Sequence, residues 1–427
     1  MESQKAFGLW SAVFLGIGSM VGAGIFIVIG QAGAIAGNLV WLTFIIGGLI
    51  ALLSGYSLAK LALRYPSRGG IIEYLVQGYG EGFFSGSLGV LFYLSQLVAL
   101  AAVSKSFGTY AATYIEHNQH LWTNCFAIGI IAFFTIINLI GATWVARSEN
   151  AIVIIKLTIL IIFTIAASFY IDPSKLKISE APPAINIFYA LGLVFFAYQG
   201  FSVITNSVED MESPQKNMLK AMSIAILLVA VLYVSISIVV LGNLSLAEVI
   251  KAKDYALAEA AKPAFGPIGF KIMAAAALIA TASAINATLY AVTEISYTLA
   301  KNGTLPKQYE YHVFNNIEGL LISAALVIPI ILFMTLDQVT IVAAIAVLLI
   351  QGFTHVGHLF KRQETGASTF IVVLAILGIF GTAFFAIDYT RRSNPDIVYY
   401  ILGAFFLAYL LEVILRISTG RVIQKSI

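Results

Sequence analysis

Long apolar runs separated by short polar segments dominate this chain. A run of about 17 to 25 residues is long enough to cross a bilayer as a helix. With approximate edges, such runs cover residues 8–36, 39–63, 82–114, 122–141, 148–171, 186–211, 217–243, 267–300, 318–335, 339–359, 368–388 and 396–417. The pattern therefore predicts an all-α integral membrane protein with about twelve transmembrane helices.

Two of the connections differ from simple loops. The segment 245–262 is too polar to span a membrane and predicts a surface helix, on which Glu259 and Lys262 face water. The segment 70–80 contains glycine and Glu73. It predicts a re-entrant or interfacial connection between two spans.

Glycine interrupts the first and the sixth apolar runs. The first contains Gly16-Ile-Gly-Ser-Met-Val-Gly-Ala-Gly-Ile-Phe26, and the sixth contains Phe195-Phe-Ala-Tyr-Gln-Gly-Phe201. Glycine costs about 1 kcal/mol in a helix interior, so both segments are expected to unwind. Interrupted helices at corresponding places in two halves indicate an inverted-repeat transporter. Close helix packing through Gly18 and Gly22 is the alternative explanation for the first segment.

Composition and charge agree with a membrane protein. The 427 residues are 60% hydrophobic and 11% charged, whereas a soluble domain carries about 25% charge. Cys125 is the only cysteine, which excludes an internal disulfide. An even number of spans puts both termini on one side, and the Lys and Arg bias predicts that this side is cytoplasmic. We expect a multi-pass protein of the cell membrane, whose first run is too long for a cleaved signal.

Lys156 is the one charge in the apolar run 151–167. An ammonium at membrane depth costs about 3 kcal/mol or more, so such a residue is by default functional. It can act as a proton carrier, because burial disfavours the charged form of a lysine, or as a permanently charged structural staple. Snorkelling to the interface is disfavoured by the apolar residues on both sides. Lys105 lies toward the outer end of the third run, where it could snorkel.

Four segments resemble those of the amino acid–polyamine–organocation (APC) permeases. Residues 16–26 look like the first-helix signature of that superfamily, and residues 196–201 look like its broken sixth helix. Residues 209–217 resemble its acidic loop, with a serine in place of the usual asparagine. Asn286-Ala287 and Lys301-Asn-Gly-Thr-Leu-Pro306 resemble the end of the eighth helix and the following loop. Within this superfamily the chain looks most similar to the proton-coupled ApcT type.

The resemblance implies a LeuT-like fold. The transport core would cover residues 8–360 as inverted repeats at about 8–171 and 186–360, each of five helices, with helices 1 and 6 broken. Residues 361–427 would form two accessory helices and a cytoplasmic tail.

The resemblance also implies a role for the buried lysine. Members of the ApcT type carry a lysine in the fifth helix, where sodium-coupled relatives hold a sodium ion. Lys156 falls at that place. Its ammonium group is expected near the Gly18 carbonyl and the Ser283 hydroxyl, which gives a proton-coupling set of these three residues.

The helix breaks are expected to bind the two ends of an α-amino acid. A helix that restarts within the membrane presents free N–H groups to a carboxylate, and one that stops presents carbonyls to an ammonium. We assign Gly22, Ala23 and Gly24 to the carboxylate. The amine side comprises Met20, Phe196, Ala197 and Gln199. Phe196 is either an aromatic gate over the substrate or an ordinary packing residue.

Several other polar residues have open roles. Tyr93, Gln96 and Asn286 are pocket walls or structural hydrogen-bonding groups. Glu209 and Asp210, near Lys216 and Lys220, form either a gate ion pair or a solvated loop. His355 and His358 share a helical face, but no further metal ligands are suggested.

The sequence therefore predicts a secondary transporter that imports amino acids with protons by alternating access. The absence of acidic residues in the two broken segments favours neutral substrates. The alternatives are a sodium-coupled or uncoupled exchanger with Lys156 as a staple, a membrane-embedded enzyme, and a channel. No cofactor, nucleic acid or obligate protein partner is expected. The partners are the amino acid, protons and lipid.

Overall fold

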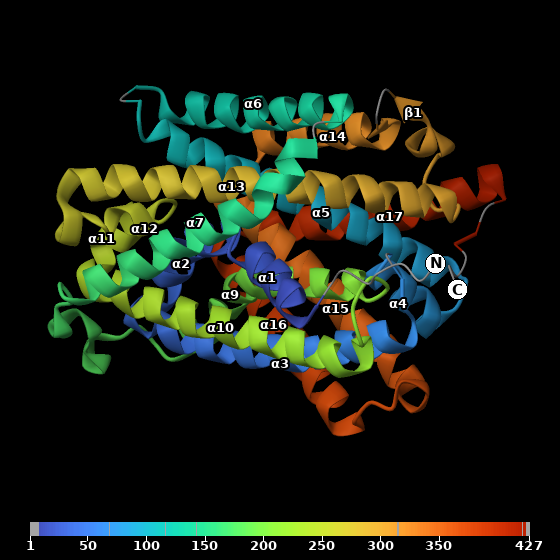
Figure 1. The fold of residues 1–427 in the computed structure, drawn as a ribbon, viewed down its shortest axis with the longest axis horizontal. Coiled ribbons are helices and arrows are strands. Elements are labelled where there is room, and N and C mark those ends of the chain that lie inside the picture. The colour runs from blue at the N-terminus through green and yellow to red at the C-terminus, as the bar shows by residue number, and fades with distance from the viewer. Residues whose placement is uncertain are drawn as a thin grey trace.

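The computed structural model describes residues 8–67, 69–115, 117–141, 143–313, 316–420 and 422–423. Helices lie side by side through nearly all of this part of the chain (Figure 1). Among the described residues, nine helices are long and apolar enough to cross a membrane, and two apolar helices are shorter. The predicted class, an all-α membrane protein, is confirmed. The count of twelve spans and the inverted repeat stay predictions.

The first part of the chain forms the helices that surround the first break. Their bounds are α1 Leu9–Met20, α2 Ala23–Ala36, η1 Gly37–Leu39, α3 Val40–Arg64, α4 Ile71–Tyr79, α5 Phe83–Ala112, α6 Gln119–Ile140 and α7 Thr143–Ser168. The short 3-10 turns η2 Pro173–Leu176 and η3 Ile178–Glu180 follow.

The second part repeats the alternation of long helices and short connections. Its elements are α8 Ile185–Tyr189, α9 Leu191–Tyr198, η4 Gln199–Ser207, α10 Pro214–Asn243, α11 Leu246–Lys251, α12 Ala256–Glu259, α13 Lys262–Lys301, η5 Lys307–Glu310, β1 His312–Val313, β2 Asn316–Ile317, α14 Glu318–Phe333, α15 Leu336–Thr365, α16 Thr369–Ser393 and α17 Asp396–Thr419. The strands β1 and β2 pair antiparallel.

The first apolar run is interrupted where its glycines predict. Val21 and Gly22 leave the helical region, with φ/ψ of −82°/51° and −102°/−119°, and this separates α1 from α2. The sixth run behaves differently. α9 does not unwind after Tyr198 but tightens directly into the 3-10 helix η4, which keeps local backbone hydrogen bonds and so avoids bare polar groups.

The 245–262 segment is not one surface helix. It forms the two short helices α11 and α12, which pack against α2. Val249 and the stretch 256–258 are fully buried, because this apolar side fits against glycines of α2. Glu259 and Lys262 do reach the surface, where they form an ion pair at 2.7 Å.

The segment 70–80 forms the short helix α4, which is largely buried, and its re-entrant or interfacial position in the membrane stays a prediction. Its residues 71–77 are all buried, and it packs against α5 and α15. α11 and α12 lie at the opposite end of the molecule from α4, with the broken helix α1–α2 and α9 between the two ends (Figure 1).

Candidate functional site at the helix breaks

Side chains from other helices cap the last carbonyls of α1. An α-helix that stops leaves four carbonyls without an intrahelical partner. Lys156 of α7 donates from Nζ to the Gly18 carbonyl at 2.7 Å, and the Val21 N–H donates to the Ile17 carbonyl at 2.8 Å. The break in the first span is therefore stabilised from outside α1, chiefly by a buried lysine.

Lys156 is fully packed inside the protein. Its side chain is 1% exposed, so Lys156 does not reach out to solvent, while its depth in the membrane stays a prediction. The ammonium lies at the C-terminal end of α1, where the helix dipole is negative. A Cβ on Gly18 would lie 2.8 Å from Val153 Cγ2. Glycine at that position therefore lets α7 approach closely enough for Lys156 to reach the carbonyl.

The other member of the predicted lysine site lies on α13. Ser283 is 5% exposed, and α13 packs against α7. The structure thus places Ser283 on a helix that contacts the one carrying Lys156. Its role in proton coupling stays a prediction.

Tyr233 of α10 links the break of the first span to the last turn of α9, and no pattern in the sequence predicted this. Its hydroxyl donates to the Met20 carbonyl at 2.7 Å and to the Ala197 carbonyl at 3.4 Å. Both carbonyls belong to the predicted amine-binding set. A tyrosine in a membrane span needs a partner for its hydroxyl when it is buried, which is the one signal in the sequence that could have indicated this residue.

Glycines let the two breaks touch through their backbones. A Cβ on Gly24 of α2 would lie 2.9 Å from the Ala197 Cα, and one on Gly200 would lie 2.5 Å from the Met20 nitrogen. Real Cβ atoms do not approach other atoms that closely. The glycines of the two motifs are therefore required by contact between α1–α2 and α9–η4 as well as by the break itself.

The predicted substrate residues occupy the two sides of this contact. Gly22, Ala23 and Gly24 stand at the start of α2, where the first N–H groups of a helix have no intrahelical acceptor. The side chain of Ala23 lies outside what the structure describes. On the other side, the Phe196 carbonyl accepts the Gln199 N–H. This carbonyl was expected to be free, and it is not. The 3-10 turn is the cause, because it pairs each N–H with the carbonyl three residues earlier.

Phe196 and Ala197 are buried, 9% and 2% exposed. They lie against the break of the first span, and Gln199 begins η4. The geometry brings the residues of the predicted site together. Their roles in binding stay predictions.

Lys105 does not snorkel. It is 3% exposed and donates from Nζ to the carbonyls of Ile331 and Met334 at 2.7 and 2.5 Å, and to Asn124 Oδ1 at 3.1 Å. The two carbonyls lie at the C-terminal end of α14. A buried cation is better stabilised by these acceptors than by a long reach to water, so Lys105 acts as a cap of α14.

Buried histidines form a hydrogen-bonded chain that the sequence did not suggest. Ser57 of α3 contacts Nδ1 of His355 and Nδ1 of His358 of α15, at 2.8 and 2.7 Å. The chain continues from His355 Nε2 to Ser54 at 2.8 Å and from His358 Nε2 to Thr365 at 2.8 Å. Both rings are fully buried. This polar chain holds α3 to α15.

Two proposed pocket walls instead make structural hydrogen bonds. The Tyr93 hydroxyl lies 2.9 Å from Ser323 Oγ, which links α5 to α14. Asn286 Oδ1 accepts from Asn138 Nδ2 at 2.9 Å, which links α13 to α6. These contacts favour the structural alternative for both residues.

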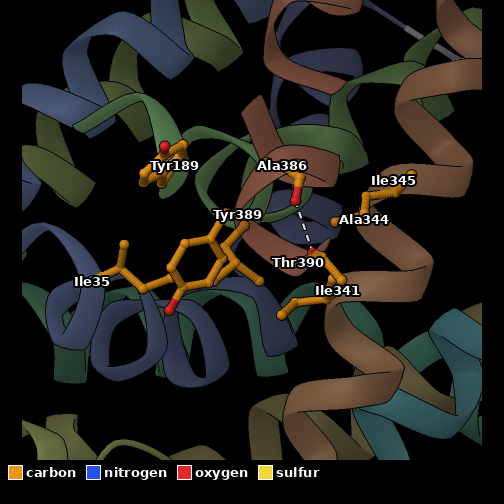
Figure 2. A pocket seen from close by; sticks show the side chains of 10 residues that line it. Ile35, Tyr189, Ile341, Ala344, Ile345, Ala386, Tyr389 and Thr390 are labelled. Atoms are coloured by element: carbon orange, nitrogen blue, oxygen red, sulfur yellow. Dashed lines mark hydrogen bonds between the residues drawn. The ribbon is translucent and has the colours of Figure 1, made fainter. Parts of the chain in front are cut away.

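A small cavity lies away from the helix breaks. Figure 2 shows it between Ile35 of α2, Tyr189 of α8, Ile341 of α15 and Tyr389 of α16. Its volume of about 10 Å³ is room for about one water molecule. It is too small for an amino acid, and none of the predicted substrate residues lines it.

Comparison with known proteins places the chain in a transporter family. A family model described as "Amino acid permease" matches residues 7–415. The inner membrane transport protein YbaT of Escherichia coli is 39% identical over 309 residues, 72% of each chain. The uncharacterized protein MJ0609 of Methanocaldococcus jannaschii is 35% identical over 426 residues, 99% of this chain and 98% of that one. The serine/threonine exchanger SteT of Bacillus subtilis is 26% identical over 71% of this chain and 70% of its own.

YbaT and SteT are transporters by name, and the family model covers almost the whole chain. The family of the chain, its membrane location and the class of its substrate follow from this. The enzyme alternative is not supported, because the names describe transport and not catalysis. The chain belongs to the amino acid permease family, within the APC superfamily.

Proposed function

We propose that the chain imports neutral amino acids together with protons, by alternating access around the two helix breaks. The observation that carries the proposal is the buried Lys156, whose Nζ lies 2.7 Å from the Gly18 carbonyl. A single ammonium that holds the end of α1 connects the protonation state of the protein to the position of the first broken helix.

The proton cycle follows from the chemistry of this contact. The charged form of Lys156 is stabilised by the Gly18 carbonyl and by the negative end of the α1 dipole. Loss of the proton removes the charge, weakens the hold on α1, and allows it to move relative to α7. One charge moving through a potential of about 100 mV supplies about 2.3 kcal/mol, roughly fifty-fold in accumulation.

The substrate would bind between the breaks. The N–H groups at Gly22, Ala23 and Gly24 suit a carboxylate, and the carbonyls of Met20 and Ala197 suit an ammonium. In the present arrangement Tyr233 donates to these two carbonyls. A bound substrate amine would compete with the tyrosine hydroxyl for them, which gives the substrate a direct way to loosen the contact between the breaks.

Two observations support neutral substrates, and a third supports an orientation in the membrane with both termini in the cytoplasm. No acidic side chain occurs in residues 16–26 or 195–201, so a basic side chain would find no counter-ion there. Relatives carry names such as serine/threonine exchanger and branched-chain amino acid permease. The Lys and Arg bias supports cytoplasmic termini, and with these α11–α12 would face outward.

An uncoupled exchanger is the second candidate, because the relative SteT is named an exchanger. In that case Lys156 would be a permanent staple. Arginine stays charged at any ordinary pH, so Lys156→Arg keeps the staple and removes the proton carrier. Lys262→Ala, which removes an exposed lysine at the first residue of α13, is the matched control.

The experiment uses purified protein in liposomes, loaded either with buffer or with unlabelled substrate. In liposomes loaded with buffer, uptake of labelled neutral amino acids should require an inward proton gradient in the wild type and in Lys262→Ala. Lys156→Arg should lose gradient-driven uptake and retain exchange. Uptake that follows sodium and ignores pH would refute the proton coupling, and full gradient-driven uptake by Lys156→Arg would refute the role of Lys156.

A further inference from the structure

The outer end of α2 is covered by the turn between α11 and α12. Gly30 of α2 lies directly under the Lys253 carbonyl, where a side chain would overlap it. The Lys253 ammonium forms an ion pair with Asp337 at the start of α15. The turn therefore ties the second half of the broken helix to α15.

The next residue of the turn, Asp254, contacts α2 directly. Gln31 Nε2 donates to Asp254 Oδ1 at 3.4 Å. Gln31 is 4% exposed, and its Oε1 atom has no hydrogen-bond partner in the part of the chain that the structure describes. A buried amide oxygen without a donor costs about 1 to 3 kcal/mol.

A proton on Asp254 would satisfy this oxygen. A carboxylate only accepts hydrogen bonds, whereas a carboxylic acid also donates one. The two polar atoms of the Gln31 amide share one carbon. An acid that accepts from Nε2 with one oxygen can therefore donate to Oε1 with the other. The unpaired Gln31 Oε1 atom is thus better matched by the protonated form of Asp254 than by the carboxylate.

The charges around Asp254 act in the same direction. Burial raises the pKa of Asp254 to about 6, with a further contribution from the negative charge of Asp337, while Gln31 and Lys253 oppose the shift. The other titratable groups that interact with this cluster are Tyr110 of α5, Tyr255 beside it, Tyr389 of α16, and, through Tyr255, Glu259 and Lys262.

We propose that Gln31, Lys253, Asp254 and Asp337 form an acid-closed latch, in which a proton bound by Asp254 locks α2 against the α11–α12 turn. The proposal rests on the proposed function only for the statement that this end faces outward. An acidic exterior would then favour closing of the outer end of α2 over the bound substrate. The proton would thus act at Asp254 as well as at Lys156.

The sign of the pH dependence follows from linkage. An exposed aspartate in the open state has an ordinary pKa of about 3.9, and in the closed state the pKa is about 6. The closed state therefore binds the proton more tightly. Its extra stability is complete below about pH 4 and is lost as the pH rises through about 6. The opening equilibrium should increase about tenfold between about pH 5 and about pH 8.

Opening can be measured without transport. Val249 of α11 is fully buried, and a Cβ on Gly33 of α2 would lie 3.2 Å from its Cγ1. Val249→Cys in a Cys125→Ser background places a small thiol in the closed contact, where a water-soluble maleimide reaches it only after opening. The same protein with Asp254→Asn carries the same thiol. The labelling rate of the protein with Asp254, divided by the rate of the protein with Asp254→Asn, both in detergent, is therefore independent of the titration of the thiol itself.

We expect this ratio to rise about tenfold from about pH 5 to about pH 8. Asp254→Asn should keep the latch closed at all pH values, because an amide can donate to Gln31 Oε1, so its labelling rate should change only through the titration of the thiol. A ratio that does not change with pH overturns the latch. The control Glu259→Gln should keep the pH-dependent ratio, and the latch is also overturned if this control loses it as Asp254→Asn does.

This test is separate from the test of transport. A protein that shows the pH-dependent labelling but no proton-driven uptake would refute the proposed function and keep the latch. A protein that shows proton-driven uptake but no pH dependence of labelling would do the reverse. Lys156→Ala should abolish proton-driven uptake and leave the labelling profile unchanged.

Discussion

The hydroxyl of Tyr233 lies 2.7 Å from the carbonyl oxygen of Met20, the last residue of α1. That carbonyl comes at the end of a helix and has no helical N–H to pair with. The same hydroxyl also reaches the Ala197 carbonyl of α9. One side chain on α10 thus holds the end of α1 and the last turn of α9 together.

Tyr233→Phe should therefore be costly. It leaves a buried carbonyl without a donor, which corresponds to about 1 to 3 kcal/mol of unfolding free energy. Tyr198→Phe is the matched control. Tyr198 donates to the Phe44 carbonyl at 3.0 Å, but Phe44 is inside α3 and keeps its helical partner. Thermal unfolding in detergent should show a larger loss for Tyr233→Phe, and equal losses would contradict this account.

The backbone contact between the breaks gives a second prediction. Gly200→Ala would place a methyl group 2.5 Å from the Met20 nitrogen, so η4 and α1 must separate. We expect a loss of about 1 to 3 kcal/mol together with impaired uptake. Gly381→Ala, where a new Cβ meets nothing within 4 Å, should be neutral or stabilising by up to about 1 kcal/mol. Unfolding curves and uptake rates check both variants, and a neutral Gly200→Ala would refute the contact.

The hydroxyl of Ser57 should matter for stability because two histidine rings depend on it. Ser57→Ala removes the bridge between His355 and His358 and leaves buried ring nitrogens without partners. We expect a loss of about 1 to 3 kcal/mol. Thr354→Val on the same helix removes a buried hydroxyl that bonds only its own helix, at the Ile350 carbonyl. Thr354→Val should cost less unfolding free energy than Ser57→Ala. A larger loss for Thr354→Val would show that the hydrogen bonds of Ser57 to the two histidines do not hold α3 to α15.

Lys105 gives a fourth prediction. Lys105→Met keeps most of the side-chain volume but removes the donor from the Ile331 and Met334 carbonyls at the end of α14. The loss should be about 1 to 3 kcal/mol or more, because several acceptors are left unpaired at once. Lys271→Met replaces an exposed lysine and should have little effect. A differential melting measurement in detergent compares them, and the cap is refuted if both variants melt alike.

Short-range patterns in the sequence predicted the class of the fold and the position of the first break. The apolar runs must become helices because a bilayer offers no partners for backbone polar groups. The glycines of residues 16–26 mark where this helix stops. The same patterns singled out Lys156, because a charge in an apolar run is visible without any knowledge of its neighbours.

The partners of these residues were decided by the tertiary structure. Tyr233, Ser57 and Lys105 meet carbonyls or rings that are distant in the sequence, and no local pattern records which helices will be adjacent. The buried faces of α11 and α12 were missed for the same reason, since their polar residues mask an apolar side that only contact with α2 explains. The sequence by itself determined which groups could not remain bare in a membrane. Packing between distant helices decided which partners satisfy them, because hydrogen bonds need contact in space and not proximity along the chain.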